Sequence, residues 1–374
     1  MISMSSPKTY ILQIGMNPNP GGLEAFVMNL YRKIDRTQVQ FDFIDWYGEE
    51  RIAFSEEILQ LGGQIIKIPS RREDFMLNKR KLKKIINSEK YRYVYNNLNS
   101  LSYISGITAT YKNPAVIPII HAHNDNIENR LWLTKMLDTL HKTRINNEKG
   151  VRLACSKKAG LWMFAQRRFQ VVPDAIDTLT FKYSPQKRKL YRKQFNLENK
   201  LVLGNVARFD PQKNHLFLID IFKHIHEKKK ESMLILVGDG RQLAEAKEHV
   251  TNLGLKDNVL FPGVRKDVPG ILQALDVMVA PSVFEGFGIS VLEAQCAGLP
   301  CYVSEVFHPE ALQTPLTKII SLNAGPKQWA EQILADYKAG ITDERMSFAN
   351  LIKSNGYDSG QLARQMQQAF VNGF

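Results

Sequence analysis

Runs of apolar and aromatic residues alternate along the chain with longer segments in which apolar residues recur at helical spacing. In the first part of the chain the runs lie at residues 10–14, 41–46, 64–68, 91–95, 116–120 and 151–155. The segments that predict helices lie at residues 23–33, 55–61, 71–86 and 101–111. This alternation of buried strand and helix, with short connections, indicates a mostly parallel sheet covered on both faces.

The same alternation starts again after a charged run at residues 182–193, which predicts a linker between two domains. The runs beyond it, at residues 201–207, 233–237, 258–263 and 277–280, predict strands, and a helix is expected at 267–276. The tail from residue 327 is helical in pattern, with breaks near Gly340 and at 355–356. We therefore expect an α/β protein with domains at residues 1–180 and 181–355 and a final segment at 356–374.

A glycine-rich loop joins the strand at 277–280 to the next helix. The strand ends at Pro281, the loop reads Glu285-Gly286-Phe287-Gly288, and the helix begins near Ile289. Free N–H groups at a helix start and the helix dipole favour an anion, and glycine lets a ligand approach the backbone. This stretch predicts a phosphate site formed by Gly286, Phe287, Gly288 and Ile289.

Two glutamates, Glu285 and Glu293, stand on this loop and helix with seven residues between them. Carboxylates repel phosphate but accept hydrogen bonds from hydroxyl groups. One glutamate at a sugar and one at a ribose, with a diphosphate between them, would fit a nucleotide sugar. From the spacing alone, the more common interpretation is that one glutamate lies in an acidic first turn of the helix, the other lies on the surface, and neither binds a ligand.

The stretch 281–300 closely resembles the signature of the retaining, nucleotide-sugar-dependent glycosyltransferases of family four. Members carry Pro-Ser-x-x-Glu-Gly-Phe-Gly, a second Glu after seven residues, and Gly-x-Pro at the end of the helix; all of these are present here. The resemblance implies the GT-B fold, which has two facing Rossmann-like domains and a last helix, here 361–370, that crosses back onto the first domain. It also implies that the domain at 1–180 binds the acceptor and that the domain at 181–355 binds the nucleotide sugar. It is strong over residues 200–303 and looser before 150. It supports Glu285 at the donor sugar and Glu293 at the ribose.

Arg208 and Lys213 lie in the loop after the strand at 201–207. A guanidinium binds two phosphate oxygens in a fork and an ammonium adds a point charge, which suits a diphosphate, although an exposed Arg and Lys ordinarily have no such role. The loop resembles the family's Gly-x6-Lys-(Gly or Asn) segment, and this resemblance implies that Arg208 and Lys213 hold the donor phosphates.

Other loops at strand ends complete the expected donor site. They contribute Gly21, Gly22, Gly238, Gly240, Val264 and Arg265. The resemblance places Gly21 and Gly22 close to the donor diphosphate, and the residues after Gly263 at the nucleotide base. At the junction of the domains, Asp174-Ala175 replaces the family's Asn-Gly, and alanine disfavours a positive φ.

Two histidines, His121 and His123, follow the strand at 116–120. Together with Asp125 they could bind a metal ion, but no further ligand stands near them, and a lone histidine is by default a structural hydrogen-bonding group. The resemblance implies a histidine near the sugar and the acceptor at the end of this strand. His121 stands in that place, and His123 is the close alternative.

The net charge of +13 predicts an anionic partner: a nucleic acid, an acidic substrate or an anionic membrane surface. Zinc-finger and RNA-recognition signatures are missing, which disfavours nucleic acid. The segment 71–86 predicts a basic helix with Phe75, Leu82 and Ile85 or Ile86 on its packed side and Lys79–Lys84 exposed, and these cations could rest on lipid headgroups.

Several features favour the cytoplasm, with peripheral contact at the inner face of the cytoplasmic membrane. Residues 1–8 are polar and lead directly into a strand, so we expect no signal peptide. No apolar run reaches the ~20 residues that span a bilayer. Cys155, Cys296 and Cys301 form no metal-ligand cluster and are expected to be reduced.

The resemblance implies a retaining glycosyltransferase that uses a nucleotide sugar, with UDP the commoner nucleotide, and a glycan or lipid-linked acceptor in bacterial capsule, exopolysaccharide or cell-wall synthesis. We expect no cofactor and no metal ion, because Arg208, Lys213 and the helix start can neutralise the diphosphate. One alternative is a non-catalytic relative that binds glycans or acts as a chaperone, but such relatives usually lose motif residues. A nicotinamide-dependent dehydrogenase is disfavoured, since residues 15–22 lack Gly-x-Gly-x-x-Gly.

Overall fold

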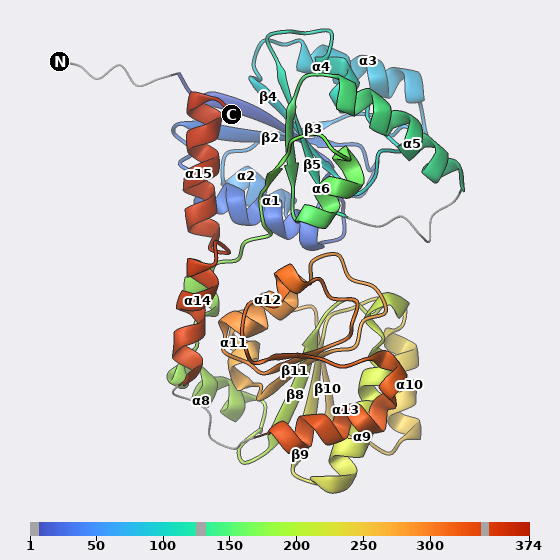
Figure 1. The fold of residues 1–374 in the computed structure, drawn as a ribbon, viewed down its shortest axis with the longest axis vertical. Coiled ribbons are helices and arrows are strands. Elements are labelled where there is room, and N and C mark those ends of the chain that lie inside the picture. Colours follow the sequence, from blue (N-terminus) through green and yellow to red (C-terminus); the bar gives the residue numbers. More distant parts are fainter. Residues whose placement is uncertain (1–6, 125–131, 338–343) are drawn as a thin grey trace, which may run out of the picture. The chain divides into compact units, whose positions relative to one another are not determined.

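The computed structural model describes residues 7–124, 132–337 and 344–374. The chain forms two compact units (Figure 1). The first contains Met1–Ala175 and Ser359–Phe374, and the second contains Ile176–Asp358. The chain therefore leaves the first unit after residue 175 and returns to it at residue 359.

The first unit is built on a seven-stranded sheet with the order β3-β2-β1-β4-β5-β6-β7, in which every pairing is parallel. Its strands are β1 Thr9–Ile14, β2 Val39–Asp45, β3 Ile65–Lys67, β4 Tyr93–Leu98, β5 Ile117–Ala122, β6 Val151–Ala154 and β7 Gln170–Val171. Its helices are α1 Gly22–Lys33, α2 Ser55–Gln60, α3 Phe75–Ile86, α4 Ser105–Thr110, α5 Trp132–Asn147, α6 Lys157–Phe164 and α15 Ser359–Asn372.

Alternate residues of these strands enter different cores, because successive side chains of a strand point to opposite faces. Ile11 and Tyr93 belong to a core that α1 and α15 complete. Their neighbours Leu12 and Val94 belong to a core that α3 completes with Leu82. Helices therefore cover both faces of the sheet.

The second unit is built on a six-stranded parallel sheet with the order β10-β9-β8-β11-β12-β13. Its strands are β8 Leu201–Val206, β9 Ser232–Val237, β10 Val259–Gly263, β11 Val277–Ala280, β12 Cys301–Val303 and β13 Thr317–Ile319. Its helices are α7 Thr178–Phe181, α8 Pro185–Gln194, α9 His215–Lys228, α10 Leu243–Asn252, α11 Val268–Ala274, α12 Ile289–Cys296, α13 Gly325–Asp336 and α14 Phe348–Ser354.

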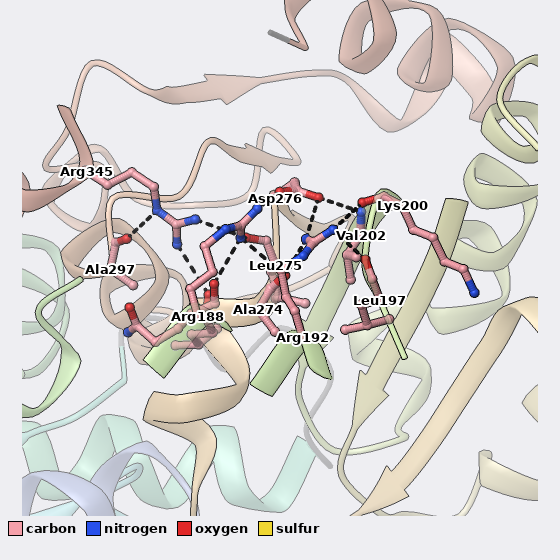
Figure 2. A network of polar contacts seen from close by, with 12 residues as sticks. Arg188, Arg192, Leu197, Lys200, Val202, Ala274, Leu275, Asp276, Ala297 and Arg345 are labelled. Atoms are coloured by element: carbon pink, nitrogen blue, oxygen red, sulfur yellow. Dashed lines mark hydrogen bonds and ion pairs between the residues drawn. The ribbon is translucent and has the colours of Figure 1, made fainter. Parts of the chain in front are cut away.

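Helix α8 corrects the prediction of a linker at residues 182–193. Arg188 of this helix forms an ion pair of 2.5 Å with Asp276, and Arg192 approaches the same carboxylate at 3.2 Å (Figure 2). Arg188 also donates to the carbonyl groups of residues 273–275 at the end of α11. The charged run is therefore a helix fixed to the second unit, and its cations neutralise an acid and the negative end of a helix dipole.

Buried Arg345 approaches the same helix end from a distant part of the sequence (Figure 2). Its guanidinium donates to the carbonyl oxygens of Ala297, Leu275 and Leu272, and lies 4.3 Å from the ring centre of Tyr183. A buried cation is costly unless its hydrogen bonds are satisfied, and here carbonyl groups and a ring take that role.

The predicted α/β fold with two Rossmann-like domains is confirmed, and the final helix α15 does pack in the first unit. Phe75 is an exception, because it was expected on the packed side of α3 but its side chain is 49% exposed. The sequence also predicts a helix start near Asn126, and this position and the predicted break near Gly340 both lie outside the described residues.

Candidate active site

The loops after β8 and β11 bring two of the expected donor residues, Lys213 and Glu285, together at the same end of the second sheet. Lys213 Nζ lies 2.6 Å from Glu285 Oε1, and the Ser282 hydroxyl donates to the same oxygen at 2.9 Å. The Glu285 side chain is nearly buried. The sequence predicted separate ligand groups for Lys213 and Glu285, whereas the structure pairs them directly.

One backbone and one side-chain hydrogen bond hold the two loops together. Val283 N donates to Gln212 O at 2.9 Å, and Gln212 Nε2 donates to Phe284 O at 2.9 Å. The residues next to Lys213 and Glu285 are therefore fixed to each other, so the ion pair does not depend on its own side chains alone. A site with such support is preorganised for a ligand.

Arg208 is separate from this pair. Its side chain is 58% exposed, and its nearest carboxylate is Asp210, at 3.7 Å. A guanidinium held so loosely is available to a phosphate. The idea that Arg208 and Lys213 grip one diphosphate together stays a prediction.

The residues of the glycine loop before α12 have two different roles: some pack against the protein, and one leaves open space. Gly288 has φ 85°, and a Cβ there would lie 2.5 Å from the Phe307 ring. Phe287 is buried and stacks on Tyr357 with ring centres 5.7 Å apart. A Cβ at Gly286, in contrast, would meet no atom within 4 Å. Gly288 and Phe287 shape the turn, and Gly286 leaves open space beside Glu285.

Glu293 lies in the second turn of α12 and is partly buried. Burial raises the pKa of its carboxyl to about 8. Its side chain makes no hydrogen bond or ion pair with any described residue, so its oxygens can take hydroxyl partners from a ligand.

Gly238 and Gly240 have a packing role that their sequence motif did not reveal. A Cβ at Gly238 would lie 2.0 Å from Ala207 O, and one at Gly240 would lie 2.7 Å from Phe209 O. Only glycine allows the loop after β9 to approach the Arg208 loop so closely. Direct contact of either glycine with a ligand stays a prediction.

Val264 and Arg265 follow β10, and they differ in whether their side chains have a partner within the protein. The Val264 side chain is 76% exposed. Arg265 makes two bonds of 2.8 Å with the carboxylate of Asp267, and its guanidinium is therefore engaged. Their place beside a nucleotide base stays a prediction.

In the first unit, His121 lies inside β5 rather than after it. Its ring is fully buried, with Nδ1 2.9 Å from the Tyr95 hydroxyl and the Phe26 ring at 4.9 Å. Burial, and then the neighbouring His123, hold its pKa well below the usual value. The side chain is enclosed in this conformation because strand alternation turns it toward α1, and its role near a sugar stays a prediction.

The alternative, His123, is also largely buried. Its Nε2 lies 3.1 Å from Asn97 Oδ1, and its Nδ1 lies 3.8 Å from Asp174 Oδ1. Asn97 in turn donates to Gln13 at 2.9 Å. His123 therefore connects a polar group at the end of β4 to Asp174, next to the boundary of the first unit.

Gly21 is the residue before α1 and Gly22 is its first residue. The start of this helix already has an anion, because buried Glu24 accepts hydrogen bonds from the Asn17 N–H at 3.0 Å and from its side chain at 2.7 Å. The Gly21-Gly22 loop is thus partly occupied by the protein's own carboxylate. A contact with a donor diphosphate there stays a prediction.

Neither a metal-binding cluster nor a membrane-spanning helix is found within residues 7–124, 132–337 and 344–374. In these ranges no three His, Cys, Asp or Glu side chains gather in a way that could hold a metal ion. None of the helices there is long and apolar enough to cross a membrane.

Residues 187–347 match the family model described as "Glycosyl transferases group 1". The chain is 30% identical over 370 residues to EpsF of Bacillus subtilis, a protein named as a glycosyltransferase, with 96% of this chain and 95% of the relative covered. The chain belongs to the glycosyl transferases group 1 family. It is therefore a glycosyltransferase.

Two further comparisons describe more distant relatives of this glycosyltransferase. It is 31% identical over 244 residues to UDP-Gal:alpha-D-GlcNAc-diphosphoundecaprenol alpha-1,3-galactosyltransferase of Escherichia coli, with 60% of each chain covered. The Anabaena protein Alr3699/HepE, solved with UDP-glucose, shares its fold with a TM-score of 0.79 at 20% identity, over 97% of this chain and 99% of that one. The predicted GT-B fold is confirmed.

His215 of the glycosyltransferase was missed by the sequence analysis. Its buried ring stacks on Phe209 with centres 4.0 Å apart, and neither ring nitrogen has a hydrogen-bond partner among the described residues. Burial, and then Lys213, lower its pKa to about 4. A histidine directly after Lys213-Asn214, at the start of a helix, was the available signal.

Proposed function

We propose that the protein transfers a sugar from a UDP-sugar to a glycan or lipid-linked acceptor in the synthesis of a bacterial surface polysaccharide, with retention at the anomeric carbon. The observation that carries this proposal is the cluster of Lys213, Glu285 and Ser282 beside open Gly286. The names of the E. coli relative and of the HepE complex support UDP as the nucleotide.

The cluster, together with exposed Arg208, offers the charges that this reaction needs. The acceptor hydroxyl attacks the anomeric carbon on the face from which the diphosphate leaves, the bond from that carbon to the phosphate oxygen breaks, and the hydroxyl proton passes to this oxygen. Lys213 and Arg208 stabilise the negative charge that develops on the diphosphate, without a metal ion. Glu285 accepts hydrogen bonds from the sugar, and its negative charge lies close to the positive charge that develops on the ring.

The first test removes the cations. Arg208→Ala and Lys213→Ala should each reduce turnover at least tenfold, since a lost charge-assisted bond at a developing oxyanion costs on the order of 2–4 kcal/mol. Lys223→Ala is the control, because Lys223 pairs only loosely with Glu227, at 3.9 Å, on α9. Turnover is measured with a panel of UDP-sugars and lipid-linked acceptors. Wild-type turnover in both variants would contradict the proposal.

The second test concerns the outcome of the reaction. A UDP-α-sugar should give an α-linked product by NMR, and EDTA should leave the rate unchanged. A β-linked product would overturn retention, and a loss of rate that Mg²⁺ or Mn²⁺ restores would overturn the metal-independent mechanism.

A third test separates the two glutamates. Glu293→Gln should weaken the binding of UDP itself, whereas Glu285→Gln should spare UDP binding and reduce transfer. Isothermal titration calorimetry with UDP, paired with turnover, distinguishes the two roles. The reverse pattern would reject this assignment.

The enzyme is further proposed to act at the inner face of the cytoplasmic membrane. The five cations of α3, Lys79, Arg80, Lys81, Lys83 and Lys84, are all exposed. Phe75 and Met76, at the start of the same helix, are exposed as well, as are Trp132, Met136 and Leu140 at four-residue intervals on α5. Cations beside exposed apolar side chains suit an anionic lipid surface.

A further inference from the structure

The first unit contains a cavity of about 510 Å³ at the carboxyl ends of its central strands. Its walls come from Ile14–Gly15 at the end of β1, Trp46–Tyr47 after β2, Asn96–Ser100 at the end of β4 with Tyr103 beyond it, and Ser70–Glu73 before α3. A cavity of this size falls within the range of small-ligand sites, ~300–1,000 Å³. All of its lining residues belong to the first unit, so the second unit forms no part of its wall.

The lining of this cavity suits a sugar. Five of its lining residues carry side-chain amides: Asn17, Asn78, Asn96, Asn97 and Asn99. An amide carries both donors and acceptors, as the hydroxyls around a sugar ring require. Trp46, Tyr47 and Tyr103 add aromatic surface for the apolar face of such a ring.

These polar groups are fixed before any ligand binds. Asn78 donates to Pro69 O at 2.7 Å and accepts from the Tyr103 hydroxyl. Asn17 binds Glu24 and accepts from the Tyr47 hydroxyl at 2.7 Å. A lining whose side chains are held by partners loses little entropy when it binds a ligand.

The charge at the rim of the cavity is positive. Arg71 and Arg72 both line it and are exposed, and neither forms an ion pair with a described residue. Arg71 lies over the Tyr103 ring, 5.0 Å from its centre. The one acid in this lining, Glu73, is engaged with the backbone N–H of Ser70 at 3.0 Å. Two guanidinium groups without a carboxylate partner among the described residues favour a group with several anionic oxygens, and a phosphate fits them better than a single carboxylate.

The first domain is the one expected to bind the acceptor, and we propose that this cavity selects, through Arg71 and Arg72, an acceptor sugar bearing a phosphate or diphosphate ester. The sugar ring lies among the asparagines and aromatic rings, and the ester lies at Arg71 and Arg72. The assignment rests on the proposed glycosyl transfer. It adds that a neutral sugar is a poor acceptor.

Binding is tested on the full-length protein by saturation-transfer NMR and calorimetry, with UDP saturating so that the donor site is filled. The probes are glucose 1-phosphate and N-acetylglucosamine 1-phosphate, against their methyl glycosides, glucuronic acid and inorganic phosphate. The sugar phosphates should bind at least tenfold more tightly than each of the others. Equal binding of the methyl glycosides, of glucuronic acid or of inorganic phosphate would overturn the proposal.

Substitution localises the effect. Arg71→Gln with Arg72→Gln should remove the preference for sugar phosphates, whereas Lys112→Gln with Lys149→Gln, which removes the same charge from exposed sites elsewhere in the unit, should keep it. Asn97→Asp, which puts a negative charge in the cavity wall, should weaken the sugar phosphates further than the methyl glycosides. An unchanged preference in the double arginine variant would overturn the proposal.

Turnover separates this proposal from the proposed function. With a diphosphate-linked sugar acceptor, the double arginine variant should raise the acceptor KM at least tenfold and leave the KM for the UDP-sugar unchanged. Equal transfer to neutral and phosphorylated acceptors by the wild type would overturn the acceptor assignment and leave glycosyl transfer standing. Failure of the wild type to bind or use any UDP-sugar would instead reject the proposed function.

Discussion

The buried carboxyl of Glu293 makes the stability of the ligand-free protein depend on pH. Burial raises its pKa to about 8 from an ordinary value of 4.5, so the folded protein retains this proton where an unfolded chain has lost it. Between these two values the folded state binds more protons than the unfolded state. The free energy of unfolding therefore decreases as the pH rises from about 4.5 to 8, and the contribution of the group is complete only below 4.5.

Glu293→Gln should remove this dependence. Without ligand, the variant should gain stability relative to the wild type as the pH rises from 5 to 9, because glutamine has no proton to lose. Melting temperatures measured across this range report the difference, with Glu331→Gln on α13 as the control. Parallel curves for the wild type and Glu293→Gln would contradict the prediction.

Candidate residues for the donor site were easier to predict from the sequence than their contacts were. Arg208, Lys213, Glu285 and Glu293 were chosen from the resemblance to the family, and their roles stay predictions. The direct pairing of Lys213 with Glu285 was not, because it depends on two loops, 72 residues apart, that meet through Val283 and Gln212. The ends of strands can be predicted from a sequence only to within one or two residues. For this reason His121 was predicted to follow β5, whereas it lies inside this strand.

At the scale of single elements, α8 and α11 depend on one carboxylate. Asp276 neutralises Arg188 and Arg192 and also accepts from the Val202 N–H at 2.8 Å (Figure 2). Asp276→Asn should lower the free energy of unfolding by about 2–4 kcal/mol, because two partly buried guanidiniums lose their counter-charge. Hydrogen exchange in α8 and α11 measures the loss. Exposed Asp257→Asn is the control, and equal protection in the two variants would contradict the prediction.

Helix α15 closes the first core with Phe370. Its ring lies 5.9 Å from the rings of Phe41 and Tyr93 and 6.3 Å from that of Tyr95. Phe370→Ala should destabilise the first unit by about 3–5 kcal/mol. Hydrogen exchange should show faster opening of β2 and β4 and unchanged β8 and β9. Exposed Gln368→Ala should have no effect, and loss of protection in both units alike would reject the prediction.

Elements were predicted well where hydrophobic spacing is regular and poorly where charge is dense. The strands of both sheets carry apolar runs and were recognised from them. The run at 182–193 lacks a buried residue within α8, so its pattern could not show a helix that is fixed by Arg188 and Arg192 through hydrogen bonds. Phe75 was placed on the packed side of α3, but Asn78, with Leu82 and Ile86, takes the buried side.

At the scale of the whole molecule, the charge of +13 leads to a prediction about membranes. Each cation near an anionic surface contributes about 1 kcal/mol, and the attraction fades within ~8 Å at physiological salt. The protein should sediment with anionic liposomes at low salt, release as salt is added, and ignore neutral liposomes. Changing Lys79, Arg80, Lys81, Lys83 and Lys84 to Gln should weaken this binding.

The matched control changes five exposed lysines of the second unit to Gln. They are Lys187, Lys189, Lys228, Lys230 and Lys256. This variant has the same net charge as the α3 variant and should still sediment. If both variants lose binding equally, the attraction belongs to the total charge and not to α3. If the wild type stays in the supernatant, the membrane proposal is wrong and glycosyl transfer is unaffected.

The return of the chain to its first unit at Ser359 has a consequence for synthesis on the ribosome. All seven strands of the first sheet emerge before residue 172, but the helix that covers Phe41, Tyr93 and Tyr95 emerges only after the whole second unit. During that interval the growing chain displays an aromatic surface of the kind that attracts chaperones and other nascent chains. The half that is made first is therefore the half that finishes folding last.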